Sequence, residues 1–265
     1  MRLIILSACL IALAAAPARG QSDPLARARA LYNERNFDGA LEAADEARRA
    51  PSHADSADLI AARAFLEKYR ETAMADDLAS ARERLRRIDA DRLDARERSE
   101  LIVGLGEDMY FDESVGAAAL LFDSLLASPD ATGRLGPAAH ELVLDWWASA
   151  LDREARPRPD IERQAVYERI RERMRAELSQ NPSSASASYW LAAAALGQGD
   201  VQAAWDAALA AWVRAPLAVD RGAALRGDLD LLVERGIVPE RSRRLAQPQE
   251  VFQAEWDAFK EKWNK

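Results

Sequence analysis

Two histidines, His53 and His140, are the first candidates for chemistry in this chain of 265 residues. His140 is followed by Glu141, and that pair begins the helical motif in which two histidines four residues apart bind zinc while the glutamate acts as a base. The position four residues after His140 is Leu144, so the second zinc ligand is missing. We therefore expect no metal site here, and we expect both histidines to lie in turns or at the surface.

Other catalytic motifs are also incomplete. Gly104 and Gly106 have the spacing that opens a phosphate-binding loop, but no third glycine and no preceding strand accompany them. Covalent acyl chemistry has no obvious nucleophile, because the only cysteine, Cys9, lies in the N-terminal leader. Acidic residues such as Asp228 and Asp230 lack the glycine-centred loop of calcium sites, and we expect them on solvated, ion-paired helix faces. The sequence thus predicts no enzyme, no catalytic residue, no cofactor and no metal.

The elements that would position any site are helices. Alanine, leucine, arginine and glutamate dominate the sequence, and no convincing stretch alternates apolar and polar residues as a strand would. Turn signals recur at helix-length intervals, for example at residues 181–182, 197–200 and 215–216. We therefore predict an all-α fold of antiparallel helices joined by short loops.

A periodic pattern occupies residues 185–216. A glycine and an aspartate at 199–200 form a turn, and three small residues then precede Pro216 on one helix face. These small residues are Ala204, Ala208 and Ala211. The pattern resembles the tetratricopeptide repeat, in which two antiparallel helices meet through small residues and a proline closes the unit.

A second good copy of this pattern covers residues 25–51, and weaker copies end near Pro129 and Pro182. The resemblance implies a right-handed α-solenoid of about five degenerate antiparallel hairpins over residues 21–216. We expect the loop at residues 156–160 to be an insertion. The alternative is an alanine-rich helical bundle without a true repeat.

The last part of the chain, residues 217–265, is predicted to form a C-terminal helical cap. We expect a helix that Gly236 closes, a short helix from Pro239, and a final helix over residues 248–263. The final helix carries one apolar stripe, made of Phe252, Trp256, Phe259 and Trp263. The stripe is expected to cover the last hairpin, and the alternative is a partner-binding face or dimer seam.

Aromatic and basic residues are the candidates for a binding surface. In the tetratricopeptide family the first helix of each hairpin lines a concave face that holds extended peptides or a partner's helix. The resemblance places Arg29, Tyr32 and Tyr189 at groove-facing positions. Trp146 and Trp147 are adjacent on a helix, about 100° apart, so we expect one of them to lie at a surface or groove. Ordinary packing between hairpins is the alternative for all five.

Residues 1–20 have the pattern of a signal peptide, with a basic start, a short apolar run and a small-residue exit. We predict cleavage after Gly20, since the apolar run is shorter than the roughly 20 residues that cross a bilayer. The residues before Cys9 resemble a lipoprotein signal, but cleavage there would leave too short a hydrophobic segment, so no lipidation is expected. We therefore expect a periplasmic or secreted protein with no membrane span once the leader is removed.

The formal net charge is −8, and the two charges of the leader, Arg2 and Arg19, are both basic. An acidic mature chain disfavours nucleic acid and anionic lipid surfaces as partners. We predict a non-enzymatic scaffold that binds another envelope protein or a peptide. The alternative is a periplasmic ligand-binding component that holds a small solute in an aromatic pocket near Trp146, Trp147 and Tyr189.

Overall fold

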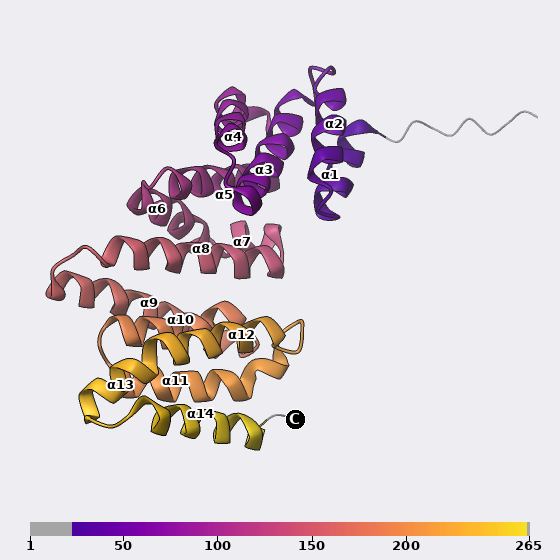
Figure 1. The fold of residues 1–265 in the computed structure, drawn as a ribbon. Coiled ribbons are helices and arrows are strands. Elements are labelled where there is room, and N and C mark those ends of the chain that lie inside the picture. Colours follow the sequence, from indigo (N-terminus) through magenta and orange to yellow (C-terminus); the bar gives the residue numbers. More distant parts are fainter. Residues whose placement is uncertain (1–22, 264–265) are drawn as a thin grey trace, which may run out of the picture.

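The fold is built from helices (Figure 1). A computed structural model describes residues 23–263, and within that range every regular element is a helix or a helical turn. The predicted all-α class is therefore confirmed. The predicted leader, its cleavage site and Cys9 lie outside the described residues. Among the helices that are described, none is long and apolar enough to cross a membrane.

The elements follow one another with short connections. Those in the first half are α1 (Pro24–Asn33), α2 (Phe37–Ala47), α3 (Ala54–Thr72), α4 (Ala75–Arg87), the 3-10 turn η1 (Ala90–Arg92), α5 (Ala95–Phe111), α6 (Val115–Leu126) and α7 (Pro129–Leu135). Those in the second half are α8 (Pro137–Ala155), α9 (Asp160–Gln180), α10 (Ala185–Gly197), α11 (Val201–Arg214), the 3-10 turn η2 (Ala215–Leu217), α12 (Ala223–Leu232), the π-helical turn η3 (Val233–Ile237), α13 (Val238–Leu245) and α14 (Gln249–Trp263).

Helices that are neighbours in the chain are also neighbours in space. Contacts join α1 to α2, α2 to α3 and α3 to α4, and further along they join α9 to α10 and α10 to α11. Figure 1 shows the resulting stack, which runs from α1 at one end of the molecule to α14 at the other. The core is accordingly divided along the stack into four clusters of buried side chains.

Capping side chains explain where several helices begin. The carboxylate of Asp94 accepts a hydrogen bond from the N–H of Glu97 at 2.8 Å, and the carboxylate of Glu97 accepts from the N–H of Asp94 at 3.0 Å. This reciprocal pair satisfies two of the free donors at the start of α5. The start of α11 has a single cap, in which the carboxylate of Asp200 accepts from the N–H of Ala203 at 3.1 Å.

Small residues allow neighbouring helices to approach closely. The alanines that carry the repeat pattern in α2 and α11 are fully buried: Ala40, Ala44, Ala204, Ala208 and Ala211. Two glycines likewise allow aromatic rings to pack directly against a helix backbone. The ring of Phe122 lies over Gly106, and the ring of Tyr167 lies over Gly197, so closely that a Cβ atom at either glycine would overlap the ring.

The expected insertion at residues 156–160 is wrong. The connection between α8 and α9 is a short turn, in which two prolines end one helix and begin the next. The extra length lies elsewhere, in the short helix α7 and in the length of α8 and α9 themselves.

The tail also differs from the expected two separate helices. Gly236 does not end a helix, because α12 continues through η3 directly into α13. The proline ring of Pro239 would meet the carbonyl of Arg235 in a regular α-helix, and the wider π turn at 233–237 gives it room. The absence of a side chain at Gly236 also leaves space for Leu196 of α10.

Candidate binding surface

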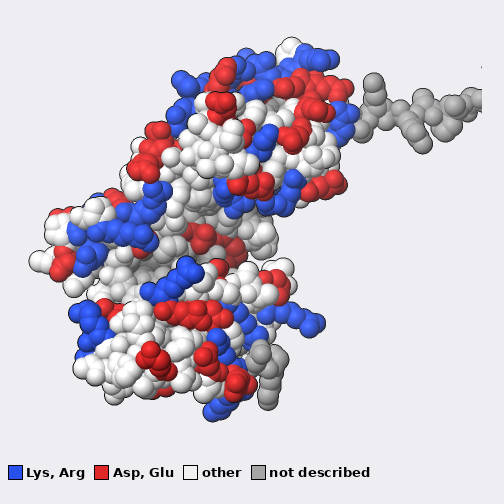
Figure 2. Space-filling model, viewed as in Figure 1, with Lys and Arg blue, Asp and Glu red and all other residues white. Residues whose placement is uncertain are grey.

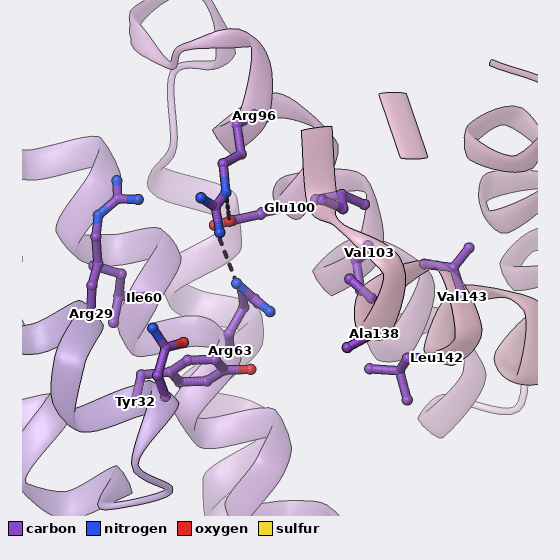
Figure 3. A pocket seen from close by; sticks show the side chains of 13 residues that line it. Arg29, Tyr32, Ile60, Arg63, Arg96, Glu100, Val103, Ala138, Leu142 and Val143 are labelled. Atoms are coloured by element: carbon purple, nitrogen blue, oxygen red, sulfur yellow. Dashed lines mark hydrogen bonds and ion pairs between the residues drawn. The ribbon is translucent and has the colours of Figure 1, made fainter. Parts of the chain in front are cut away.

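A partly open cavity lies between the N-terminal helices and α8. Its volume is about 290 Å³. Its wall is formed by α1, α3, α5 and α8, with Leu135 at the end of α7. Figure 3 shows Arg29, Tyr32, Arg63 and Arg96 on one side of the space and apolar side chains of α5 and α8 on the other.

The polar side of the cavity carries three arginines and one carboxylate. Arg63 of α3 and Arg96 of α5 share Glu100, at 3.2 Å and 3.0 Å respectively. Arg29 of α1 forms an ion pair with Glu97, one turn earlier on α5. The lining therefore has an excess of positive charge, presented by side chains that neighbouring carboxylates hold in place.

Tyr32 closes this side of the cavity. The guanidinium of Arg63 lies 4.7 Å from the centre of the Tyr32 ring, close enough for a cation–π contact. Burial raises the pKa of Tyr32 to about 12, although the charge of Arg63 acts in the opposite direction. The phenol is therefore neutral at physiological pH and available as a hydrogen-bond donor.

An open groove lies on the other flank of α8. Its volume is about 480 Å³, and its walls come from α8, α10 and α12. Apolar and aromatic side chains form most of its surface, with Leu142, Tyr189 and Leu225 as the largest. Three carboxylates stand among them: Glu141 and Asp145 of α8 and Asp228 of α12.

Neutral donors fix two of these carboxylates. Glu141 accepts hydrogen bonds from the hydroxyl of Ser184 and the N–H of Ser186, both at 3.1 Å. Asp145 accepts from the indole N–H of Trp190 at 2.7 Å. The start of α10 thus orients Glu141, and Trp190 in the middle of the same helix orients Asp145.

Asp145 and Asp228 are exposed at the groove surface, yet the neighbouring protein still disfavours their charged forms. Crowding by surrounding protein raises the pKa of Asp145, and repulsion from Asp228 and Glu141 adds to that effect against the hydrogen bond from Trp190. Loss of solvation also raises the pKa of Asp228. The pKa of Tyr189 is raised by burial first and by Asp228 next. A positive charge bound in the groove would lower the pKa of all three groups.

The cavity and the groove adjoin each other through α8. Ala138 and Leu142, one turn apart, line both hollows. Successive positions around the helix then diverge, since Ala139 and Val143 face the cavity while Glu141 and Asp145 face the groove. Figure 2 shows a hollow in the middle of the molecule with acidic side chains in it, while other acidic side chains are spread over the rest of the visible face.

Three of the five predicted groove residues line these hollows. Arg29 and Tyr32 line the cavity, and Tyr189 lines the groove. Trp146 and Trp147 line neither. Both belong to α8 and are buried in the core, with 9% and 1% of their surface exposed.

The expectation that one of the two tryptophans faces a groove is therefore wrong, and so is an aromatic pocket formed by both. The two side chains point about 100° apart, but both directions lead into the core, because α8 is packed against α5, α6, α9 and α10. Trp146 packs against aromatic rings of α5, and the guanidinium of Arg169 in α9 covers Trp147.

The apolar stripe of α14 is divided between interior and surface. Phe252 and Trp256 are buried against α11, α12 and α13, and Phe259 packs at the edge of the same cluster. Trp263, at the end of the helix, keeps 43% of its surface exposed. Most of the stripe is thus occupied by contacts within the chain, and only Trp263 offers a large exposed face.

His140, the remaining candidate for chemistry, forms a contact within the chain. His140 Nε2 lies 3.0 Å from the Glu177 carboxylate of α9. Within residues 23–263, no three of the histidine and acidic side chains are arranged to hold a metal ion. Of the charged residues that line the hollows, no motif singled out Arg63, Arg96, Glu100 or Asp145. The helical spacing of Arg96 with Glu100 and of Glu141 with Asp145 nevertheless places each pair on one face.

Comparison with known proteins adds no relative: no protein-family model, curated protein or solved structure matches this chain. Function is therefore inferred from the surface described above.

Proposed function

We propose that this protein is a non-enzymatic scaffold or adaptor of the cell envelope, which binds a peptide or partner protein along the side of α8 where the two hollows meet. We further propose that its helices form a tetratricopeptide-like solenoid and that this side is the concave face. The buried alanines of α2 and α11 support that arrangement, because they lie at the close helix contacts that the repeat requires.

The observation that carries the proposal is the continuity of the cavity and the groove. An enclosed site would suit one small molecule, but here Ala138 and Leu142 line both hollows at once. An extended chain that crosses α8 at Ala138 and Leu142 would place successive side chains in hollows of different charge. The leader predicted from residues 1–20 supports an exported location for such a scaffold.

Native mass spectrometry of the protein, gently purified from its own host, tests this proposal. The expected result is a chain that begins at Gln21 with a polypeptide partner in fixed stoichiometry. A protein that carries only a small non-protein adduct, or no adduct at all, would contradict the scaffold.

A second candidate function is supported by the cavity alone. Its volume of about 290 Å³, its apolar wall and its converging arginines suit a small solute with an anionic group. In that case the adduct in the same spectrum would be small and acidic, and Arg63→Met would remove it, because Arg63 is the arginine held between Glu100 and Tyr32.

A further inference from the structure

We propose that the groove between α8, α10 and α12 binds a partner segment that presents lysine or arginine beside apolar side chains. This inference rests on the proposed scaffold function, and it assigns a chemical class to the partner.

The charge of the groove is uncompensated. Glu141, Asp145 and Asp228 are its only charged lining residues, and among the described residues none of the three forms an ion pair. Asp145 and Asp228 are exposed, and Glu141 is half-buried. Several other acids of the chain are paired with arginine instead. Asp58, for example, meets Arg48 at 3.0 Å and Arg84 at 2.8 Å.

The acidic groups retain capacity for a ligand. The bond from Trp190 reaches only one oxygen of Asp145, and no side chain of the described range donates to Asp228. Two of the three are nevertheless oriented, because donors of α10, the N–H of Ser186 and the indole of Trp190, hold Glu141 and Asp145 on one face of α8. Ammonium and guanidinium groups are the donors that such carboxylates accept best.

The rest of the groove suits the stem of a basic side chain. Leu142, Tyr189 and Leu225 provide an apolar surface between the carboxylates. Lysine and arginine lay their methylene stems along such surfaces while their charged ends remain at the polar rim. Apolar residues next to the basic residue in the partner would cover the part of the apolar groove surface that the stem does not contact.

A peptide fits this groove better than a metal ion. No three of the acidic side chains are close enough to surround one ion within the described range, so the charge is spread over the walls of α8 and α12. A volume of about 480 Å³, open along one side, has room for several side chains of an extended segment.

A two-step experiment tests the inference. A random heptapeptide library displayed on phage is first selected on the purified full-length protein. The most enriched peptide, labelled with fluorescein, is then titrated against the protein and against two double variants by fluorescence polarisation.

The groove variant is Asp145→Asn with Asp228→Asn, which keeps side-chain shape and the acceptor for Trp190 while it removes two charges. The control is Asp76→Asn with Asp206→Asn, because both of these aspartates are exposed and line neither hollow. The two double variants have the same net charge, so general attraction between an acidic protein and a basic peptide affects them equally.

The expected result is enrichment of lysine or arginine next to apolar residues, with the dissociation constant raised about tenfold in the groove variant and less than about twofold in the control. Equal weakening in both variants would overturn the inference. So would complete displacement of the peptide by micromolar spermidine, which would assign the groove to a free polyamine.

The selection also separates this inference from the scaffold itself. Binders without basic residues would leave the scaffold standing and refute only the assigned partner class. A library that yields no binder at all would count against both proposals.

Discussion

Individual carboxylates in this protein differ mainly in what faces them. Asp58 is buried between two arginines, and Glu100 is shared by two more. Glu107 of α5 is the opposite case: 6% of its surface is exposed, and its raised pKa shows that the charges around it do not offset its burial. Its charge is therefore tolerated only at a cost in stability.

Glu107 predicts a specific pH dependence. Burial raises its pKa to about 7, against 4.5 for the free side chain, and Arg63 only partly opposes this. Between these two values the folded protein binds more protons than the unfolded chain, so the free energy of unfolding falls as pH rises from about 4.5 to 7. The loss that belongs to Glu107 amounts to roughly 3 kcal/mol.

Glu107→Gln, which mimics the protonated side chain, removes this loss. Urea unfolding at pH 5 and pH 8 should show that the variant exceeds the parent protein in stability at pH 8, and that this advantage shrinks at pH 5. Parallel stability profiles for the two proteins would show that Glu107 does not titrate in this range.

At the scale of single elements, close packing depends on particular small residues. Gly197 lies at the end of α10 under the ring of Tyr167, whose hydroxyl donates to Asp152 at 2.8 Å. This hydrogen bond restricts the movement of the ring. The helix contact therefore has little room for an added methyl group.

Gly197→Ala is expected to destabilise the protein by about 1–3 kcal/mol, because its Cβ would lie 2.3 Å from the Tyr167 ring. Gly227→Ala in α12 is the matched control, since nothing lies within 4 Å of its added Cβ. That change should stabilise the helix by about 0.5–1 kcal/mol. Similar melting temperatures for the two variants would refute the close contact.

The terminal helix α14 gives a second comparison within one element. Trp256 is fully buried, its ring centre lies 5.3 Å from that of Trp212, and its indole N–H donates to Asp230 at 2.8 Å. Trp256→Ala should cost about 3–5 kcal/mol. Trp263→Ala should cost far less, about 0.5 kcal/mol, because Trp263 lies at the end of the helix with 43% of its surface exposed.

Chemical denaturation of the two tryptophan variants measures both values. If Trp263→Ala proved the more damaging change, α14 would not cover the preceding helices as described.

Local signals in the sequence predicted many elements because caps and turns act over a few residues. Asp200 and the turn before α11 are examples. The continuous helix through 233–237 was missed, because glycine and proline were read as stop and start signals, and a π turn accommodates both. The buried state of Trp146 and Trp147 was missed because it depends on helices on several sides of α8.

At the scale of the whole molecule, the hollows were beyond reach of the sequence. Asp228 and Asp230 were expected to be alike, yet Asp230 pairs with Lys260 at 2.9 Å while Asp228 lines the groove beside Asp145. Residues from distant parts of the chain meet there only because the stack brings α8, α10 and α12 together. The charge pattern of one helix does not show which residues of other helices will lie beside it.

The most direct test of a binding surface along α8 is site-specific photo-crosslinking in the native host. Benzoylphenylalanine is placed at Ala138, an exposed residue that lines both hollows, and at Leu120 of α6, which is exposed and lines neither. The scaffold predicts a covalent adduct of defined mass with one polypeptide at position 138 and none at 120. No polypeptide adduct at 138, or the same adduct from both positions, would contradict it.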